Sequence, residues 1–171
     1  MGKELTPPGW VLDESREWWE RLLKVGKCPV RRLAYLAKTP PSIRISPRMT
    51  STIGRAIYLK NEIRLSDLYL KHVNKDEFNL VIAHEAAHIF VNRINECECS
   101  HDDRWKKAMR SIDLDPNTHF KFDISPNVHV VLTCRECQLF YALHYKDYYK
   151  VISEGSNISC ERCGNPYVSV K

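Results

Sequence analysis

The stretch of the chain that decides its fold begins at Asn74 and reads NKDEFNLVIAHEAAHIFVNRI. From Phe78 onward, apolar residues occupy nearly every side of the expected helix, which is typical of a helix buried at the centre of a domain. Asn74, with Glu77 three residues later, forms a variant of the capping box that begins helices. This stretch therefore predicts the central helix around which the rest of a domain packs.

Two histidines and one glutamate interrupt the apolar helix, in the order His84-Glu85-Ala86-Ala87-His88. Residues four apart lie on the same face of a helix, so both imidazoles can reach one metal ion. Glu85 lies about 100° round the helix from His84, outside the ligand shell but close enough to accept a proton from water that the metal activates. The pattern predicts metal-assisted hydrolysis; the alternative is a pair of core histidines bonded to backbone carbonyls.

A catalytic zinc site needs a third protein ligand. We favour His101, at the start of a helix expected over residues 100–112, because a helix N-terminus disfavours the charged imidazolium and keeps the ring able to bind metal. The metzincin pattern is excluded, since Val91 and Ile94 stand where it requires glycine and histidine. The rival ligands are Glu96, Cys97, Glu98 and Cys99.

Four of the seven cysteines form two CxxC pairs, Cys134 with Cys137 and Cys160 with Cys163. This arrangement predicts a zinc ribbon, and Gly164 suits the tight turn after the last cysteine. Four thiolates close the coordination shell, so this second zinc would be structural and would supply folding energy to a small unit. A redox role is the rival interpretation, but no thioredoxin-like βαβ pattern surrounds either pair.

Aromatic and basic residues lie between and after the cysteine pairs. They are Phe140, Tyr141, His144, Tyr145, Lys146, Tyr148, Tyr149, Lys150 and Tyr167. Exposed rings beside cations form platforms on which single-stranded nucleic-acid bases stack. The same rings can equally fill the interior of a ribbon that has little else to bury, and the sequence leaves both interpretations open.

Further elements are expected around the central helix. They are a helix over 13–25 capped by Asp13, a helix over 29–37, a strand over 43–46, a hairpin over 56–66 turning at Asn61-Glu62, and a short helix capped by Ser66. Trp18 and Trp19 on the first helix are expected to pack in the core.

The chain has 171 residues and a net charge of +5, mostly carried by its first half. This length suits one domain with a small appendage, and the charge is compatible with a nucleic-acid partner without requiring one. No apolar run approaches the roughly 18 residues of a membrane helix, and no secretory leader is evident. We expect no membrane partner and a reducing compartment, the cytoplasm or a nucleus, where paired thiols bind zinc.

Taken together, these motifs resemble the SprT-like zinc metalloprotease family, which includes bacterial SprT and the eukaryotic DNA–protein crosslink protease Spartan. The resemblance covers about residues 42–171 and rests on Ile63-Arg64-Leu65-Ser66, His84-Glu85-Ala86-Ala87-His88, Ser100-His101, Trp105-Lys106-Lys107-Ala108-Met109 and the paired cysteines. It implies that His84, His88 and His101 bind zinc and that Glu85 is the catalytic base. Spartan-type members cleave proteins trapped on DNA, so it also implies a protein substrate and a single-stranded or junction DNA partner.

The expected fold class is α+β, a small zincin-like metalloprotease domain followed by a zinc ribbon. We expect an N-terminal helical segment over residues 1–41, the zincin-like core over 42–125 and the ribbon over 126–171. The expected function is a zinc-dependent endopeptidase acting on DNA-bound proteins, with one catalytic and one structural Zn2+. The alternatives are a non-catalytic binding module and a processing protease that acts without DNA.

Overall fold

The chain divides into two compact units, residues 1–121 and 122–171, which are described separately. The computed structural model describes residues 5–49, 52–98, 100–116, 120, 122, 129–137, 140–144, 147–148, 158–160 and 162–169. Both helices and strands occur, so the chain is of the mixed α+β class that the sequence predicts. Within these residues, no helix is both long and apolar enough to cross a membrane.

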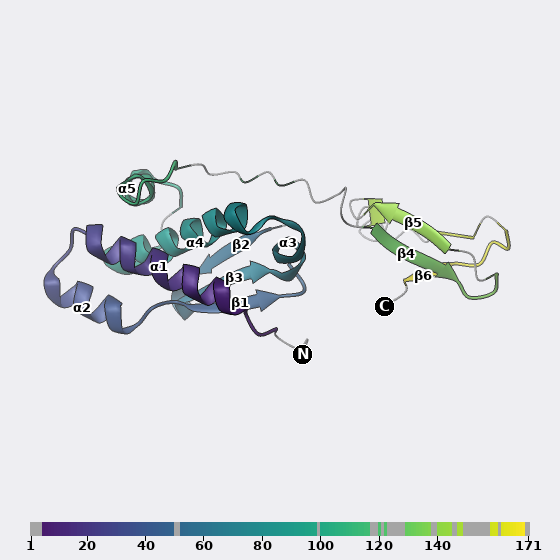
Figure 1. The fold of residues 1–171 in the computed structure, drawn as a ribbon, viewed down its shortest axis with the longest axis horizontal. Helices are drawn as coiled ribbons and strands as arrows, with labels where there is room; N and C mark the ends of the chain where they lie inside the picture. The colour runs from purple at the N-terminus through teal and green to yellow at the C-terminus, as the bar shows by residue number, and fades with distance from the viewer. Residues whose placement is uncertain are drawn as a thin grey trace. The chain divides into compact units, whose positions relative to one another are not determined.

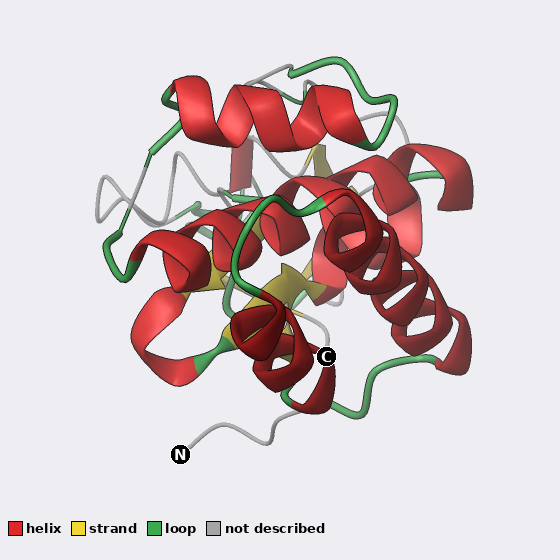
Figure 2. Cartoon of the chain, turned by 90° about the vertical axis from the view of Figure 1, so that its left-hand side faces the viewer, coloured by secondary structure: helices red, strands yellow, loops and turns green. Residues whose placement is uncertain are grey.

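The first unit combines helices with a small sheet (Figure 1). Its elements are α1 (Gly9–Val25), α2 (Val30–Lys38), β1 (Ser42–Ser46), β2 (Gly54–Ile57), the 3-10 helix η1 (Tyr58–Lys60), β3 (Glu62–Ser66), α3 (Asp67–His72), α4 (Lys75–Asn95) and α5 (Asp103–Ser111). Helix α4 contacts α1 on one side and strands β2 and β3 on another (Figures 1 and 2). The sheet and α1 therefore enclose the central helix.

Helix α4 is the buried helix that the sequence predicts. The Asn74 side chain accepts a hydrogen bond from the Glu77 backbone N–H at 2.8 Å, which confirms the expected cap. Phe78, Ile82 and Ile89 are among its fully buried side chains. The burial of an all-round apolar helix is the main hydrophobic contribution to this unit.

The sheet has the strand order β1-β3-β2, with β1 parallel and β2 antiparallel to β3. Strands β2 and β3 form the predicted hairpin, but its connection consists of η1 and Asn61, which adopts a left-handed backbone (φ 48°). Glu62, expected in the turn, is instead the first residue of β3. Leu5 pairs with Ile45 on the outer side of β1. In the described part of the chain, no strand pairs with the outer edge of β2, so this edge of the sheet is open.

Successive side chains on a strand point to opposite faces of the sheet. Ile63 and Leu65 of β3 are fully buried on the face toward α4. Glu62 and Arg64 alternate with them and therefore lie on the opposite face.

The first helix begins four residues earlier than the predicted start at Asp13. Pro8 occupies the N-cap position of α1, and no side chain caps the helix there. The fixed φ of proline suits a helix start, and the burial of Val11 stabilises the extra turn. The expected core role of the tryptophan pair is confirmed, because Trp18 and Trp19 are both buried.

Helix α5 is shorter than the predicted helix over 100–112. Asp102 caps it by accepting hydrogen bonds from the backbone N–H groups of Arg104 and Trp105. The helix ends at Ser111, and Asp113 just beyond has a left-handed backbone (φ 61°). Because the Asp102 side chain binds the free N–H groups at the helix start, the helix begins at Asp103 and His101 precedes it.

The second unit contains β4 (His129–Cys134), β5 (Phe140–His144) and β6 (Tyr167–Ser169). They form a sheet of order β5-β4-β6, in which β4 runs antiparallel to both neighbours. Both predicted cysteine pairs lie in this unit.

Candidate metal centres

Three histidines of the first unit bring their ring nitrogens together. His84 and His88 lie one turn apart on α4, and His101 lies on the connection before α5. The Nε2 atom of His101 is 2.9 Å from that of His84 and 3.2 Å from that of His88. The residues predicted as ligands therefore point at one common position.

The spacing of these nitrogens fits a metal ion. A tetrahedral zinc ion with Zn–N distances of about 2.0–2.1 Å holds its ligand nitrogens about 3.3 Å apart. The Nε2 separations of 2.9 and 3.2 Å are close to this value. Three neutral imidazoles form the donor set of many zinc enzymes, so this group is compatible with zinc.

Trp105 of α5 packs against all three histidine rings. Its ring centroid lies 4.6 Å from that of His84, 5.1 Å from that of His88 and 4.7 Å from that of His101. The indole is fully buried, and its Nε1–H points to the backbone oxygen of His84 at 3.4 Å. The sequence pattern indicated only an apolar helix face at Trp105, whereas the structure makes it the packing platform of the histidine cluster.

Glu85, the predicted base, is buried beside the three histidines. Burial raises its pKa to about 7, because a buried carboxylate loses the hydration that stabilises its charge. A hydrogen bond from the Ala56 backbone N–H and the charge of Arg55 oppose this shift. The carboxyl group is thus held against strand β2, with a pKa close to neutral pH.

Gly54 lets strand β2 approach Glu85 this closely. A β-carbon at Gly54 would lie 2.9 Å from Glu85 Cγ and 3.0 Å from both Glu85 Oε1 and Val81 Cγ1. The first separation is shorter than real β-carbons adopt and the other two are tighter than most of their contacts, so any larger residue would push the strand or the carboxylate aside. The role of Gly54 was not predicted from the sequence, although a glycine inside a strand is a known sign of close approach.

A hollow of about 250 Å3 opens beside the histidine cluster. It is lined by Ala56, His84, Glu85, His88, Asn92, Glu98 and His101. Asn92 is buried and Glu98 is exposed. No role for Asn92 was predicted from the sequence, and Glu98 was expected only as a rival metal ligand.

Of the other rival ligands, two contact arginine side chains and one lies outside the residues that the structure describes. Glu96 forms an ion pair with Arg32 at 2.6 Å, and the Cys97 thiol accepts a hydrogen bond from Arg104 at 3.3 Å. Cys99 is outside the described residues. Among the described side chains, the metal-ligating group here consists of the three histidines.

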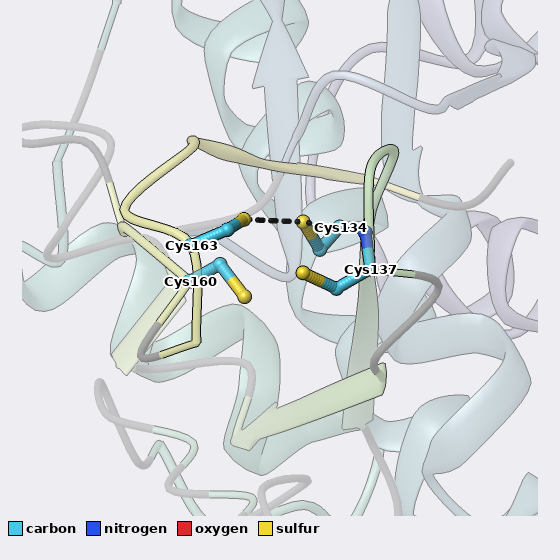
Figure 3. A group of neighbouring side chains, drawn as sticks. All are labelled: Cys134, Cys137, Cys160 and Cys163. Carbon is cyan, nitrogen blue, oxygen red and sulfur yellow. Dashed lines mark hydrogen bonds between the residues drawn. The ribbon is translucent and has the colours of Figure 1, made fainter.

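The four predicted cysteines of the second unit converge in the same way (Figure 3). Their sulfur atoms all lie within 4.8 Å of one another, and those of Cys134 and Cys163 are 3.5 Å apart. A zinc ion with Zn–S distances of about 2.3 Å would hold its sulfurs about 3.8 Å apart, so this group also suits zinc. Gly164 has a left-handed backbone (φ 72°) and donates its N–H to the Cys160 carbonyl at 2.8 Å, which forms the expected tight turn.

The aromatic residues of this unit fall partly outside the description. Tyr148 and Tyr167 are partly buried. Tyr145, Lys146, Tyr149 and Lys150, with the side chains of Phe140, Tyr141 and His144, lie outside the described residues. The choice between a stacking platform and an interior filling therefore stays open.

The fold and the two clusters define an α+β protein with two candidate metal-binding groups. A profile of the SprT-like family matches residues 20–125, more than half of the sequence, and the chain belongs to this family. The Protein SprT of Photorhabdus laumondii is 28% identical over 141 residues, covering 79% of this chain and 71% of that protein. The Protein SprT of Vibrio parahaemolyticus is 25% identical over 127 residues, covering 74% and 76%. No solved structure matches the chain.

Proposed function

We propose that this chain is a zinc-dependent endopeptidase of the SprT-like type, built as a zincin-like domain with a C-terminal zinc ribbon. The observation that carries the proposal is the convergence of three histidine Nε2 atoms beside the buried carboxyl group of Glu85. A structural metal site has no need of a buried general base beside its ligands. A hydrolytic site requires one.

His84, His88 and His101 would hold the zinc ion, and Trp105 would keep their rings in place. When bound, zinc supplies Lewis-acid polarisation of a carbonyl group and lowers the pKa of water. Three protein ligands leave room for water and substrate, whereas the four cysteines close their shell. We therefore assign the first zinc to catalysis and the second to the folding of residues 122–171.

Glu85 would carry the proton during hydrolysis. It accepts a proton from the attacking water as the water oxygen bonds to the peptide carbonyl carbon. It then donates this proton to the amide nitrogen as the C–N bond breaks, which releases a neutral amine. A pKa raised to about 7 suits both steps, because a group of this pKa accepts and releases protons readily near neutral pH.

We further propose that the substrates are proteins bound to or crosslinked with DNA, and that single-stranded or junction DNA is a partner. The family resemblance supports this step, and the net charge of +5 is compatible with it.

The test compares Glu85→Gln with the zinc-loaded wild-type chain in cleavage of a protein substrate that binds DNA. The variant should keep zinc and fold but lose at least about 100-fold in rate, as removal of a general base does. Glu77→Gln is the matched control, because Glu77 is exposed at the start of the same helix. This variant should cleave the substrate at the wild-type rate. Equal cleavage by wild type and Glu85→Gln would refute the mechanism.

A parallel series with and without a single-stranded oligonucleotide tests the DNA partner. Faster cleavage with DNA is expected. Cleavage that is unchanged by DNA would favour a processing protease that acts without DNA. No cleavage under either condition would favour a non-catalytic binding module.

A further inference from the structure

Three arginines lie in register across the sheet of the first unit. Arg44 of β1 pairs with Arg64 of β3, and Arg64 pairs with Arg55 of β2. All three belong to the face opposite α4, because each alternates with residues that face the helix. Like charges at directly paired positions destabilise a sheet, so this row requires compensation.

Glu62 supplies that compensation to two of the three arginines. Its carboxylate oxygens lie 2.9 Å from Arg44 Nε and 2.5 Å from Arg64 Nη2, and its side chain is only 6% exposed. Arg55 is exposed at the open edge of the sheet. Among the described residues it forms no ion pair within 4.0 Å, although its charge lowers the pKa of the buried Glu85 carboxyl group.

Arg55 and Arg64 line a hollow of about 230 Å3 along β2 and η1. The hollow is completed by Ala56, Ile57, Tyr58, Leu59 and Glu98. Ala56 and Glu98 also line the first hollow, together with the three histidines and Glu85. The two hollows are therefore adjacent, and a chain lying across the metal site would place a neighbouring side chain in the second one.

We propose that this second hollow is a substrate subsite that recognises an acidic side chain, aspartate or glutamate, close to the scissile bond. This inference rests on the proposed peptidase function and names the residue that would determine specificity, Arg55. A guanidinium group binds a carboxylate through two parallel hydrogen bonds, which favours it over a neutral amide of the same shape. Arg64 is already held by Glu62, so it adds a fixed positive charge at low entropic cost. Ile57 and Leu59 offer apolar surface to the methylene groups of the substrate side chain.

A single carboxylate fits this hollow better than a nucleic-acid backbone does. A row of phosphates requires positive charge along its whole length. Here the Glu62 carboxylate lies between Arg44 and Arg64, and its negative charge disfavours a continuous row of phosphates along the arginines. The small volume likewise suits one side chain rather than a strand.

The experiment uses the zinc-loaded full chain and a peptide library with glutamate, glutamine or lysine at each position near the cleaved bond. Wild type should cleave glutamate peptides at least about fivefold faster in kcat/KM than glutamine peptides at one position. Arg55→Glu should abolish this preference and favour lysine there. Arg16→Glu, the same charge reversal on an exposed α1 residue, should leave the preference unchanged.

Binding is measured separately, so that it does not depend on turnover. Zinc-loaded Glu85→Gln should bind the glutamate peptide more tightly than the glutamine peptide, and adding Arg55→Glu should remove the difference. If wild type cleaves no peptide but this binding preference is present, the peptidase proposal fails and the subsite stands. Cleavage or binding without any acidic preference overturns the subsite. Loss of oligonucleotide binding in Arg55→Glu, with peptide preference unchanged, would assign Arg55 to nucleic acid instead and also overturn it.

Discussion

Gly54 and Glu85 approach each other so closely that the absent β-carbon of the glycine would lie 2.9 Å from Glu85 Cγ. Strand β2 and helix α4 therefore meet through the glycine of the strand and the proposed proton carrier of the helix. Two residues further along the same strand, the Ala56 backbone N–H donates a hydrogen bond to the Glu85 carboxylate. The position of the carboxyl group is thus determined by the strand as much as by its own helix.

Replacing Gly54 with alanine should impair cleavage without unfolding the protein. The new methyl group must displace β2 or Glu85, and a displacement of about 1 Å in an active site can cost about 100-fold in rate. We expect kcat/KM to fall by about 10- to 100-fold, with zinc content unchanged. Gly9→Ala is the control, because a β-carbon there meets nothing within 4 Å. Normal activity in Gly54→Ala would show that the close approach has no role in catalysis.

Glu85 should make the metal-free protein less stable as the pH rises. Its pKa is about 7 when folded and about 4.5 when unfolded, so the folded state binds the proton more tightly. The stabilisation is complete below pH 4.5 and is lost as the pH rises through 7, at a cost of about 3 kcal/mol. Glu85→Gln cannot ionise and should exceed wild type in free energy of unfolding at pH 8, but not at pH 5.

Urea titrations of metal-free protein, followed by tryptophan fluorescence, measure this difference. All four tryptophans lie within residues 1–121, so the fluorescence reports on the first unit alone. If the free energies of unfolding of wild type and Glu85→Gln change with pH in the same way, the raised pKa assigned to Glu85 is contradicted. Added zinc should shrink the difference, because a nearby cation favours the ionised carboxylate.

Trp105→Phe should weaken zinc binding by the three histidines. The smaller ring loses the contact of Nε1 with the His84 carbonyl and part of the packing against all three imidazoles. Residues that orient metal ligands typically contribute about 10- to 100-fold to metal affinity, and we expect the lower value because a ring remains. Competition with a zinc chelator measures the affinity. Trp10→Phe, which changes a tryptophan packed on Phe78, should bind zinc as wild type does.

The two metal-binding groups should load independently. His101→Ala should reduce bound zinc from two ions per chain to one while leaving the second unit folded. Cys163→Ala should also reduce it to one, but here residues 122–171 should lose their structure, because a small unit depends on its metal. Elemental analysis measures the zinc, and proteolysis distinguishes the units. Loss of both ions from either variant would show that the sites are coupled.

The sequence was sufficient to predict features that depend on neighbours along the chain. The α4 cap at Asn74 and the i, i+4 placement of His84 and His88 follow from helical periodicity, which local residues determine. Each cysteine pair is similarly local, because one short turn contains it. Their convergence also requires the pairing of β4 with β6, which no local pattern reveals.

Features that depend on packing between distant segments were not predictable. The contact of Gly54 with Glu85 requires the position of β2 against α4, which no periodicity reveals. The role of Trp105 depends on the angle at which α5 meets α4. The spacing of apolar residues along α5 does not reveal this angle, because any helix that packs on a core has the same spacing. The predicted start of α5 was wrong by a few residues. Asp102 caps the helix, but serine and aspartate have similar capping preferences, so the sequence did not distinguish a start at Ser100 from one at Asp103.

His101 differs from the other two histidines in lying on the connection between α4 and α5 rather than on the central helix. Metal binding and the order of this connection are therefore thermodynamically linked. A molecule that binds the connection in the arrangement in which His101 contacts zinc must raise the affinity of the protein for zinc. Zinc must raise the affinity of the protein for that molecule by the same factor. The zinc dissociation constant can thus serve as a sensor for partners of this segment, even for a partner that never touches the metal.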